Sequence, residues 1–117
     1  MIRVALLMAL AAGPALAASD PLAGKALYAQ CAACHSLDAD TSALGPSLKG
    51  VVGRKAGAVE AYVYSPPMRR ADVTWTSETL DAFLADPQAV VPGNKMPFSG
   101  MAAPKDREDL IAYLAAP

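Results

Sequence analysis

The sequence has little of what builds a large hydrophobic core. Only seven of the 117 residues are aromatic (one Trp, four Tyr and two Phe), although 54% of the chain is apolar. Much of that apolar share is alanine, which buries little surface per residue. A chain of this length forms one domain, and a domain with so thin a core is only marginally stable. It would gain stability from a large bound apolar group.

The sequence also lacks an excess of charge of one sign and any alternating strand pattern. Ten basic residues stand against eleven acidic ones, and no block of like charge occurs. A nucleic-acid partner is therefore not expected. Because no segment alternates apolar and polar residues, the sequence predicts an all-α fold.

The first 17 residues predict a secretory signal peptide. Arg3 supplies a basic start, residues 4–12 are apolar, and Ala15–Ala17 offers the small residues of a cleavage site. A retained membrane anchor is the alternative, but the apolar run is too short to span a bilayer. We therefore expect export to the periplasm, with one domain over residues 18–117 and a formal charge of −2 after removal of Arg3.

Pro, Gly and capping residues divide the exported domain into helices and loops. Asp20 and Pro21 are typical of a helix start, and Pro87 of a helix end. Three main helices are expected, over residues 21–33, 77–86 and from 104 or 105 to 115. Residues 36–73, with at most one short helical turn, and 87–101 read as loops. Loops this long fit a small domain if they wrap around a cofactor.

One motif carries chemistry, the C-x-x-C-H sequence of residues 31–35. It is the attachment signature of haem c, in which two thiols form thioethers with the porphyrin vinyl groups and the next histidine binds the iron. A redox dithiol would accompany a βαβ pattern, and a zinc site needs four ligands, whereas the chain has two cysteines and one histidine. A disulfide would not explain His35. The motif therefore predicts one haem c, bound covalently through Cys31 and Cys34 and ligated by His35.

The second axial ligand is inferred by elimination. His35 is the only histidine, so a second histidine ligand is excluded, and electron carriers often pair histidine with methionine. Met68, Met96 and Met101 remain after the signal peptide. Met96 is favoured because Pro97 biases it toward an extended backbone in a loop. Met68 and Met101 are interpreted as core gap-fillers.

An ordered set of motifs, beyond C-x-x-C-H, resembles the class I cytochrome c family, in the branch of soluble bacterial relatives of the mitochondrial carrier. The resemblance covers nearly the whole chain after residue 17. Its segments are residues 31–35, 45–57, 64–65, 74–75, 92–100 and 107–114. It implies a small all-α cytochrome c fold, with three main helices and loops wrapped around one covalently bound haem.

The resemblance also implies roles for individual residues. Met96 matches the axial methionine, and Pro46 matches the proline whose carbonyl accepts the other ring N–H of His35. Arg54, Tyr64 and Trp75 match residues around a buried propionate. Phe98 matches an aromatic residue that shields the haem.

Two further features of this chain follow from the resemblance. The contact between the first and last helices is matched by Gly24, Tyr28, Leu110 and Tyr113. Phe83 stands where many relatives have a tyrosine that hydrogen-bonds the axial methionine.

An iron with both axial positions filled by His35 and Met96 favours electron transfer over catalysis. The sequence therefore predicts a monomeric, non-enzymatic, one-electron carrier in the periplasm. Its partners would be redox proteins, such as a membrane cytochrome bc-type complex and an oxidase or photosynthetic reaction centre. An electron-accepting subunit of a periplasmic dehydrogenase would share these motifs and is the alternative. A haem peroxidase or gas sensor would need an open iron position.

Overall fold

The computed structural model describes Ala5 and residues 18–39 and 43–116, and in these residues it contains five helices. Their bounds are α1 Pro21–Tyr28, α2 Pro66–Arg70, α3 Ser77–Ala85, α4 Pro87–Val90 and α5 Pro104–Ala115. Three are main helices, as the sequence predicts, and two are short. Of the short ones, α2 lies in the segment where one helical turn is expected, whereas α4 is not predicted. Apart from Ala5, the predicted signal peptide lies outside the described residues. None of the described helices is both long and apolar enough to cross a membrane.

Helix α1 begins where the sequence predicts and ends earlier. The Asp20 carboxylate accepts a hydrogen bond from the Leu22 N–H at 2.9 Å, and Pro21 occupies the first turn. The predicted end at residue 33 is wrong, because the helix ends at Tyr28. Beyond it, N–H groups bond to carbonyls three residues back, including Cys31 to Tyr28 at 2.8 Å. Such tight turns are usual at helix ends, and they carry the C-x-x-C-H segment here.

Helices α3 and α4 share Asp86 as a boundary. Thr76 caps α3 through a reciprocal capping box with Thr79. The prediction that Pro87 opens a loop is wrong, because it opens α4. Pro is tolerated in the first turn of a helix, and the Asp86 carboxylate accepts from the Ala89 N–H at 3.4 Å.

The long segment between α1 and α3 is loop apart from α2. In the described residues no strand forms, and one isolated antiparallel bridge joins Lys55 to Thr74. Beside the bridge, the Trp75 N–H donates to the Arg54 carbonyl at 2.9 Å. This backbone pairing places Arg54 next to Trp75, although they are far apart in the sequence.

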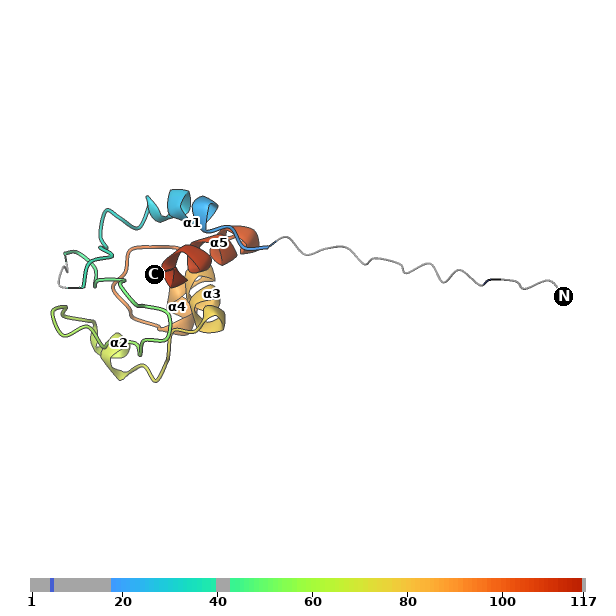
Figure 1. Ribbon diagram of the computed structural model, residues 1–117. Helices are drawn as coiled ribbons and strands as arrows, with labels where there is room; N and C mark the ends of the chain where they lie inside the picture. The colour runs from blue at the N-terminus through green and yellow to red at the C-terminus, as the bar shows by residue number, and fades with distance from the viewer. Residues whose placement is uncertain (1–4, 6–17, 40–42, 117) are drawn as a thin grey trace.

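Helices α1 and α5 cross closely and hold the helical part of the molecule together (Figure 1). A Cβ added to Gly24 would lie 1.9 Å from the backbone oxygen of Asp109, so only glycine allows this approach. The rings of Tyr28 and Tyr113 pack with their centroids 5.5 Å apart. The predicted contact between the first and last helices is confirmed.

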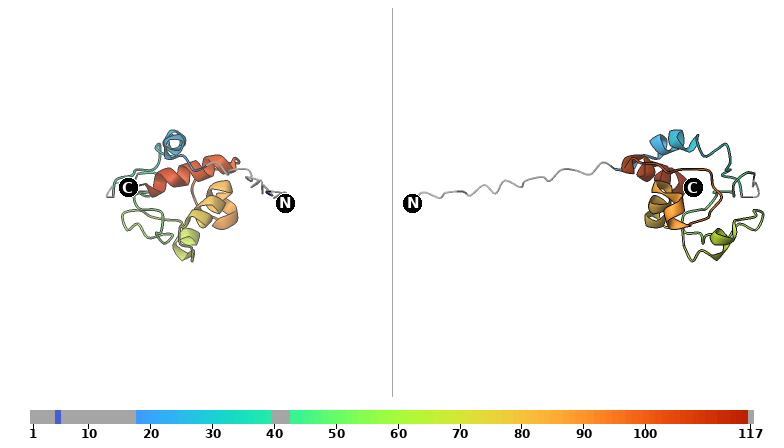
Figure 2. Two further views of the ribbon diagram at one scale, coloured as in Figure 1. Left: turned by 45° about the vertical axis from the view of Figure 1, so that its right-hand side comes forward. Right: turned by 180° about the vertical axis from the view of Figure 1, so that it is seen from behind.

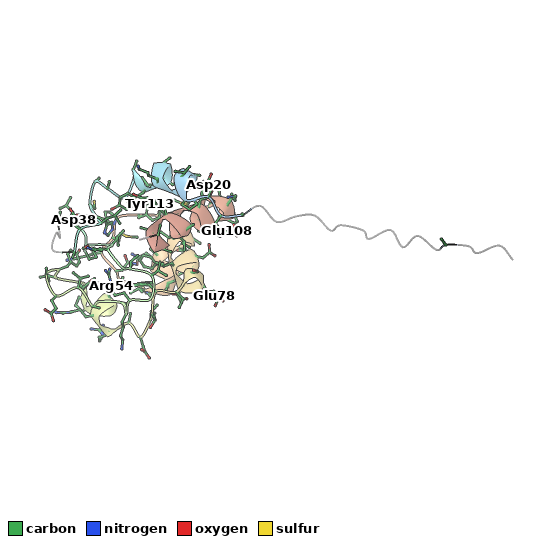
Figure 3. All side chains as sticks on the ribbon, in the orientation of Figure 1. Asp20, Asp38, Arg54, Glu78, Glu108 and Tyr113 are labelled. Atoms are coloured by element: carbon green, nitrogen blue, oxygen red, sulfur yellow. The ribbon has the colours of Figure 1, made fainter. Side chains whose placement is uncertain are left out.

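The loops and helices enclose a cavity rather than one continuous core. Figures 1 and 2 show α1, α3, α4 and α5 grouped together, with the loops and α2 forming the rest of the described domain. Buried side chains form two clusters, one around Trp75 and Phe83 and one around Tyr28, Met101 and Leu110. Arg54 lies among the loops, away from Glu78 and Glu108 at the helical end (Figure 3). The thin core that the composition implies is thus divided around a cavity.

Candidate functional site

A cavity of about 760 Å³ is lined by side chains of both clusters. This volume is within the range of about 300–1,000 Å³ that is common for cofactor sites. All nine residues for which the sequence predicts a cofactor or metal role line it: Cys31, Cys34, His35, Pro46, Arg54, Tyr64, Trp75, Met96 and Phe98. Tertiary structure therefore brings together residues from five of the sequence segments named above.

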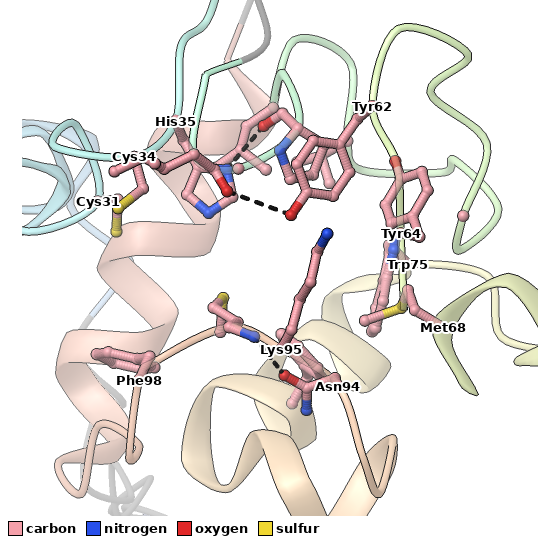
Figure 4. Close-up of a pocket in the computed structure, with 18 of the residues that line it drawn as sticks. Cys31, Cys34, His35, Tyr62, Tyr64, Met68, Trp75, Asn94, Lys95 and Phe98 are labelled. Carbon is pink, nitrogen blue, oxygen red and sulfur yellow. Dashed lines mark hydrogen bonds between the residues drawn. The ribbon is translucent and has the colours of Figure 1, made fainter. Parts of the chain in front are cut away.

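Cys31 and Cys34 lie beside His35 at one wall of the cavity (Figure 4). Both thiols are half-buried, and no disulfide joins them. Burial, followed by the neighbouring Cys34, raises the pKa of the Cys31 thiol. The His35 N–H donates to the Cys31 carbonyl at 2.9 Å, which fixes the histidine backbone relative to the thiols.

The ring of His35 is held in one tautomer by a backbone carbonyl. Its Nδ1 lies 2.7 Å from the carbonyl oxygen of Pro46. Because a carbonyl oxygen can only accept, Nδ1 carries the proton, and the Nε2 lone pair of a neutral ring is left to bind a metal. The backbone at Gly45 lies against the ring, where an added Cβ would come within 2.6 Å of Cε1. Glycine at this position therefore permits the bond between His35 and Pro46.

The loop with Asn94 and Lys95 bounds the cavity on the side facing His35 (Figure 4). In this loop, both backbone polar groups of Met96 are hydrogen-bonded. Its N–H donates to the Asn94 side-chain oxygen at 3.0 Å, and its carbonyl accepts from the Phe98 N–H at 2.9 Å. The side chain of Met96 is half-buried and lines the cavity.

Asn94 is a site residue that the sequence analysis did not single out. It is 6% exposed, and its amide nitrogen donates to the carbonyls of Pro87 at 3.1 Å and Val91 at 2.9 Å. The side chain of Gln88 adds two bonds, to the Asn94 carbonyl at 2.8 Å and from the Gly93 N–H at 2.9 Å. Asparagine in a Pro-Gly-Asn turn is the one signal in the sequence that points to such a network.

Arg54 is anchored by backbone carbonyls through its terminal nitrogens, whereas its Nε makes no hydrogen bond to the described residues. Its two terminal nitrogens donate to the carbonyls of Lys49 at 3.1 Å and Ser47 at 2.9 Å. Its Nε is buried and, among the described residues, has no partner. Burial lowers the pKa of the guanidinium, so an anion next to it would be stabilising. Because Arg54 also lines the cavity, an acceptor bound next to it there would satisfy this N–H.

Tyr64 and Trp75 lie next to each other on the same side of the cavity (Figure 4). The Tyr64 hydroxyl accepts from the Val59 N–H at 3.1 Å, which leaves its own proton free to donate. Trp75 is 6% exposed and packs on Phe83 with ring centroids 4.9 Å apart. Phe83 has no hydroxyl, so this part of the cavity wall is apolar.

The remaining sulfur and aromatic side chains occupy distinct positions. Met68 lines the cavity, whereas Met101 is 8% exposed in the cluster with Tyr28 and Leu110 and does not line it. Phe98 packs against that second cluster at the edge of the cavity. The interpretation of Met101 as a core residue is confirmed by its burial.

The described groups fit a haem. Two adjacent thiols, a neutral imidazole with a free nitrogen and a thioether line one apolar cavity. A buried guanidinium N–H without an acceptor fits a carboxylate such as a haem propionate. These are the groups needed for covalent attachment, axial ligation and charge pairing.

Comparisons with known proteins agree with this fit. The cytochrome c family model matches residues 22–116. The chain is 47% identical over 87 residues to cytochrome c2 iso-2 of Magnetospirillum fulvum, covering 74% of this chain and 91% of that protein. It is 48% identical over 96 residues to cytochrome c of Tetrahymena pyriformis, covering 81% of this chain and 86% of that protein.

A solved structure is also similar. Cytochrome cH from Methylobacterium extorquens superposes with a TM-score of 0.77 at 43% sequence identity. The match covers 82% of this chain and 97% of that one. The similarity therefore extends to the tertiary structure as well as to the motifs.

Proposed function

The chain belongs to the cytochrome c family, and from this premise we propose that it is a periplasmic electron carrier whose iron is ligated by His35 and Met96. Membership of the family establishes the cofactor and the general class of the protein. The protein is a non-enzymatic monohaem cytochrome c, with haem c attached at Cys31 and Cys34. The ligands, the location and the partners are the proposal.

The observation that carries the ligand proposal is that His35 and Met96 line one cavity with their backbones fixed. The bond from Nδ1 to Pro46 presents Nε2 of His35 as a metal ligand. The loop around Met96 presents a thioether, which cannot be deprotonated and favours the reduced state of iron. When bound, the haem supplies a one-electron couple of Fe(III) and Fe(II).

Two protein ligands leave no iron position open to oxygen or peroxide. The ring of His35 is hydrogen-bonded to the Pro46 carbonyl, and the backbone of Met96 to Asn94 and Phe98, so little rearrangement is needed when the charge of the site changes. We infer that these ligands confine the protein to outer-sphere electron transfer.

Arg54, Tyr64 and Trp75 are proposed to surround a propionate. The unpartnered Nε of Arg54 and the free hydroxyl proton of Tyr64 supply donors for a carboxylate. Donors at this position keep a buried carboxylate ionised. Phe98, at the edge of the cavity, is proposed to exclude water from it.

The proposed location and partners rest on the sequence. Residues 1–17 have the pattern of a cleaved signal peptide. A periplasmic carrier would exchange electrons with membrane complexes, such as a cytochrome bc-type complex and an oxidase or reaction centre. The measurement is the N-terminus of the exported protein, which should be Ala18, and recovery of the holoprotein with an uncut N-terminus would contradict export by cleavage.

The ligand proposal is tested with the purified holoprotein and two variants. The oxidised wild type should be low-spin and show the methionine-to-iron charge-transfer band, and Met96→Ala should abolish that band. Met68→Leu, at another methionine of the same cavity, is the matched control and should keep it. A high-spin wild-type spectrum, or survival of the band in Met96→Ala, would show that Met96 is not the ligand.

A further inference from the structure

The segment from Gln88 to Met96 is held by five side-chain hydrogen bonds, in addition to backbone bonds from Val91 to Pro87 and from Asn94 to Val91. Asn94 supplies three of its hydrogen bonds: two donated to the carbonyls of Pro87 and Val91, and one accepted from the Met96 N–H. The partners fix the orientation of the amide, since carbonyls need its nitrogen and an N–H needs its oxygen. Asn94 therefore connects the end of α4 directly to the backbone of Met96.

Gln88 completes the same turn from the outside. Its amide nitrogen donates to the Asn94 carbonyl and its amide oxygen accepts from the Gly93 N–H. One side chain thus holds the backbone on both sides of the Gly93–Asn94 peptide bond. Gln88 is exposed and Asn94 is 6% exposed, so the bonds made by Asn94 are the better shielded from water.

We propose that Gln88 and Asn94 form a hydrogen-bond clamp that positions Met96 and sets how readily an external ligand displaces it from the iron. This inference rests on the proposed function, in which Met96 is a ligand. An external ligand binds only after Met96 has left, so its apparent affinity scales with the fraction of molecules in which the loop is open. A clamp that holds the closed loop lowers that fraction.

Imidazole is the probe, titrated optically into the oxidised holoprotein at fixed pH. Asn94→Ala removes three hydrogen bonds from a buried site and should raise the apparent imidazole affinity by about tenfold or more. Gln88→Ala removes two bonds from an exposed site and should raise it by about two- to fivefold. Asn94→Ser, whose hydroxyl can still accept from the Met96 N–H, should give an intermediate value.

Ser99→Ala is the matched control. Ser99 is exposed in the same loop, and among the described residues its side chain makes no hydrogen bond. This variant should bind imidazole as the wild type does. Denaturant unfolding of each holoprotein measures global stability separately, so that all titrations are made where the protein is folded.

The outcomes separate the clamp from the ligand assignment. If Asn94→Ala lowers global stability and binds imidazole no more tightly than Ser99→Ala, the network is merely structural and the clamp is refuted, while Met96 remains the ligand. If the wild type lacks the methionine charge-transfer band, the ligand assignment fails and the clamp fails with it. The clamp is supported by higher imidazole affinity in the order Asn94→Ala, Asn94→Ser, Ser99→Ala.

Discussion

Replacing Gly45 by alanine tests the link between the backbone and the ring of His35. The added Cβ would lie 2.6 Å from Cε1, 2.8 Å from Nδ1 and 3.1 Å from Nε2 of His35. The backbone of Gly45 has no positive φ, so alanine brings no conformational strain there. The effect of the change is therefore steric, and it falls on the ring.

The magnitude follows from these distances. Carbon atoms in contact prefer a separation of about 3.5–4.0 Å, so the ring must retreat by roughly 1 Å. A retreat of this size breaks the 2.7 Å bond from Nδ1 to the Pro46 carbonyl. Overpacking costs about 1–3 kcal/mol and the lost hydrogen bond about 1 kcal/mol, so unfolding free energy should fall by about 2–4 kcal/mol. For a domain of this size the melting temperature should fall on the order of 10–30 °C.

The assay combines denaturant unfolding of the holoprotein with potentiometric titration. Loss of the bond to Pro46 makes His35 a weaker donor to iron, so the reduction potential should rise. Gly50→Ala is the matched control, because its φ of 66° costs about 1–2 kcal/mol while its Cβ meets nothing within 4 Å. The reasoning is refuted if Gly45→Ala unfolds like Gly50→Ala and keeps the wild-type potential.

Three further changes test other parts of the structure. Gly24→Ala should destabilise the holoprotein by about 3 kcal/mol or more, because its Cβ would lie 1.9 Å from a backbone oxygen of α5; an unchanged thermal midpoint would contradict the close crossing. The hydrogen bond from Lys105 holds the pKa of the Asp109 carboxyl below its ordinary value of 3.8. The stability contributed by this ionised carboxyl is therefore present above about pH 3.8 and lost as pH falls through the lower folded value. Asp109→Asn should lose less stability than the wild type between pH 5 and pH 2 in urea unfolding, and equal losses would exclude Asp109 as a source of acid sensitivity. Arg54→Met should lower the reduction potential by on the order of tens of millivolts, because a positive charge near iron favours Fe(II). Arg54→Lys keeps the charge, so its reduction potential should stay close to that of the wild type. Equal potentials in Arg54→Met and Arg54→Lys would argue against a charge effect.

The sequence predicts local features well where one residue type has one physical consequence. Asp20 and Pro21 marked the start of α1, and the helix expected from residue 77 does begin there, because capping is decided within a few residues. The same Asp-Pro signature at residues 86 and 87 marks α4, which the sequence analysis treated as a loop. The end of α1 could not be predicted from the sequence. The tight turns after Tyr28 continue into a segment that is held by a long-range hydrogen bond, from the Gly45 N–H to the Cys34 carbonyl at 2.8 Å.

Residues with a role fixed by covalent chemistry were accessible from the sequence alone. Cys31, Cys34 and His35 are adjacent, so their spacing by itself indicates the cofactor, and His35 is the only histidine. Elimination then pointed to Met96. These residues line one cavity, while their ligand roles remain predictions for the spectra of the holoprotein to decide.

Tertiary structure alone decided what surrounds those residues. Whether a carbonyl lies 2.7 Å from Nδ1 of His35 depends on how a glycine-containing loop packs on the ring. Only the folded loop places two carbonyls at the terminal nitrogens of Arg54 and buries its Nε without a partner among the described residues. The support of Met96 by Asn94 depends on amide orientation and burial. Sequence determined the kind of cofactor because attachment is local and covalent, whereas folding determined the hydrogen bonds, which join groups brought together only in space.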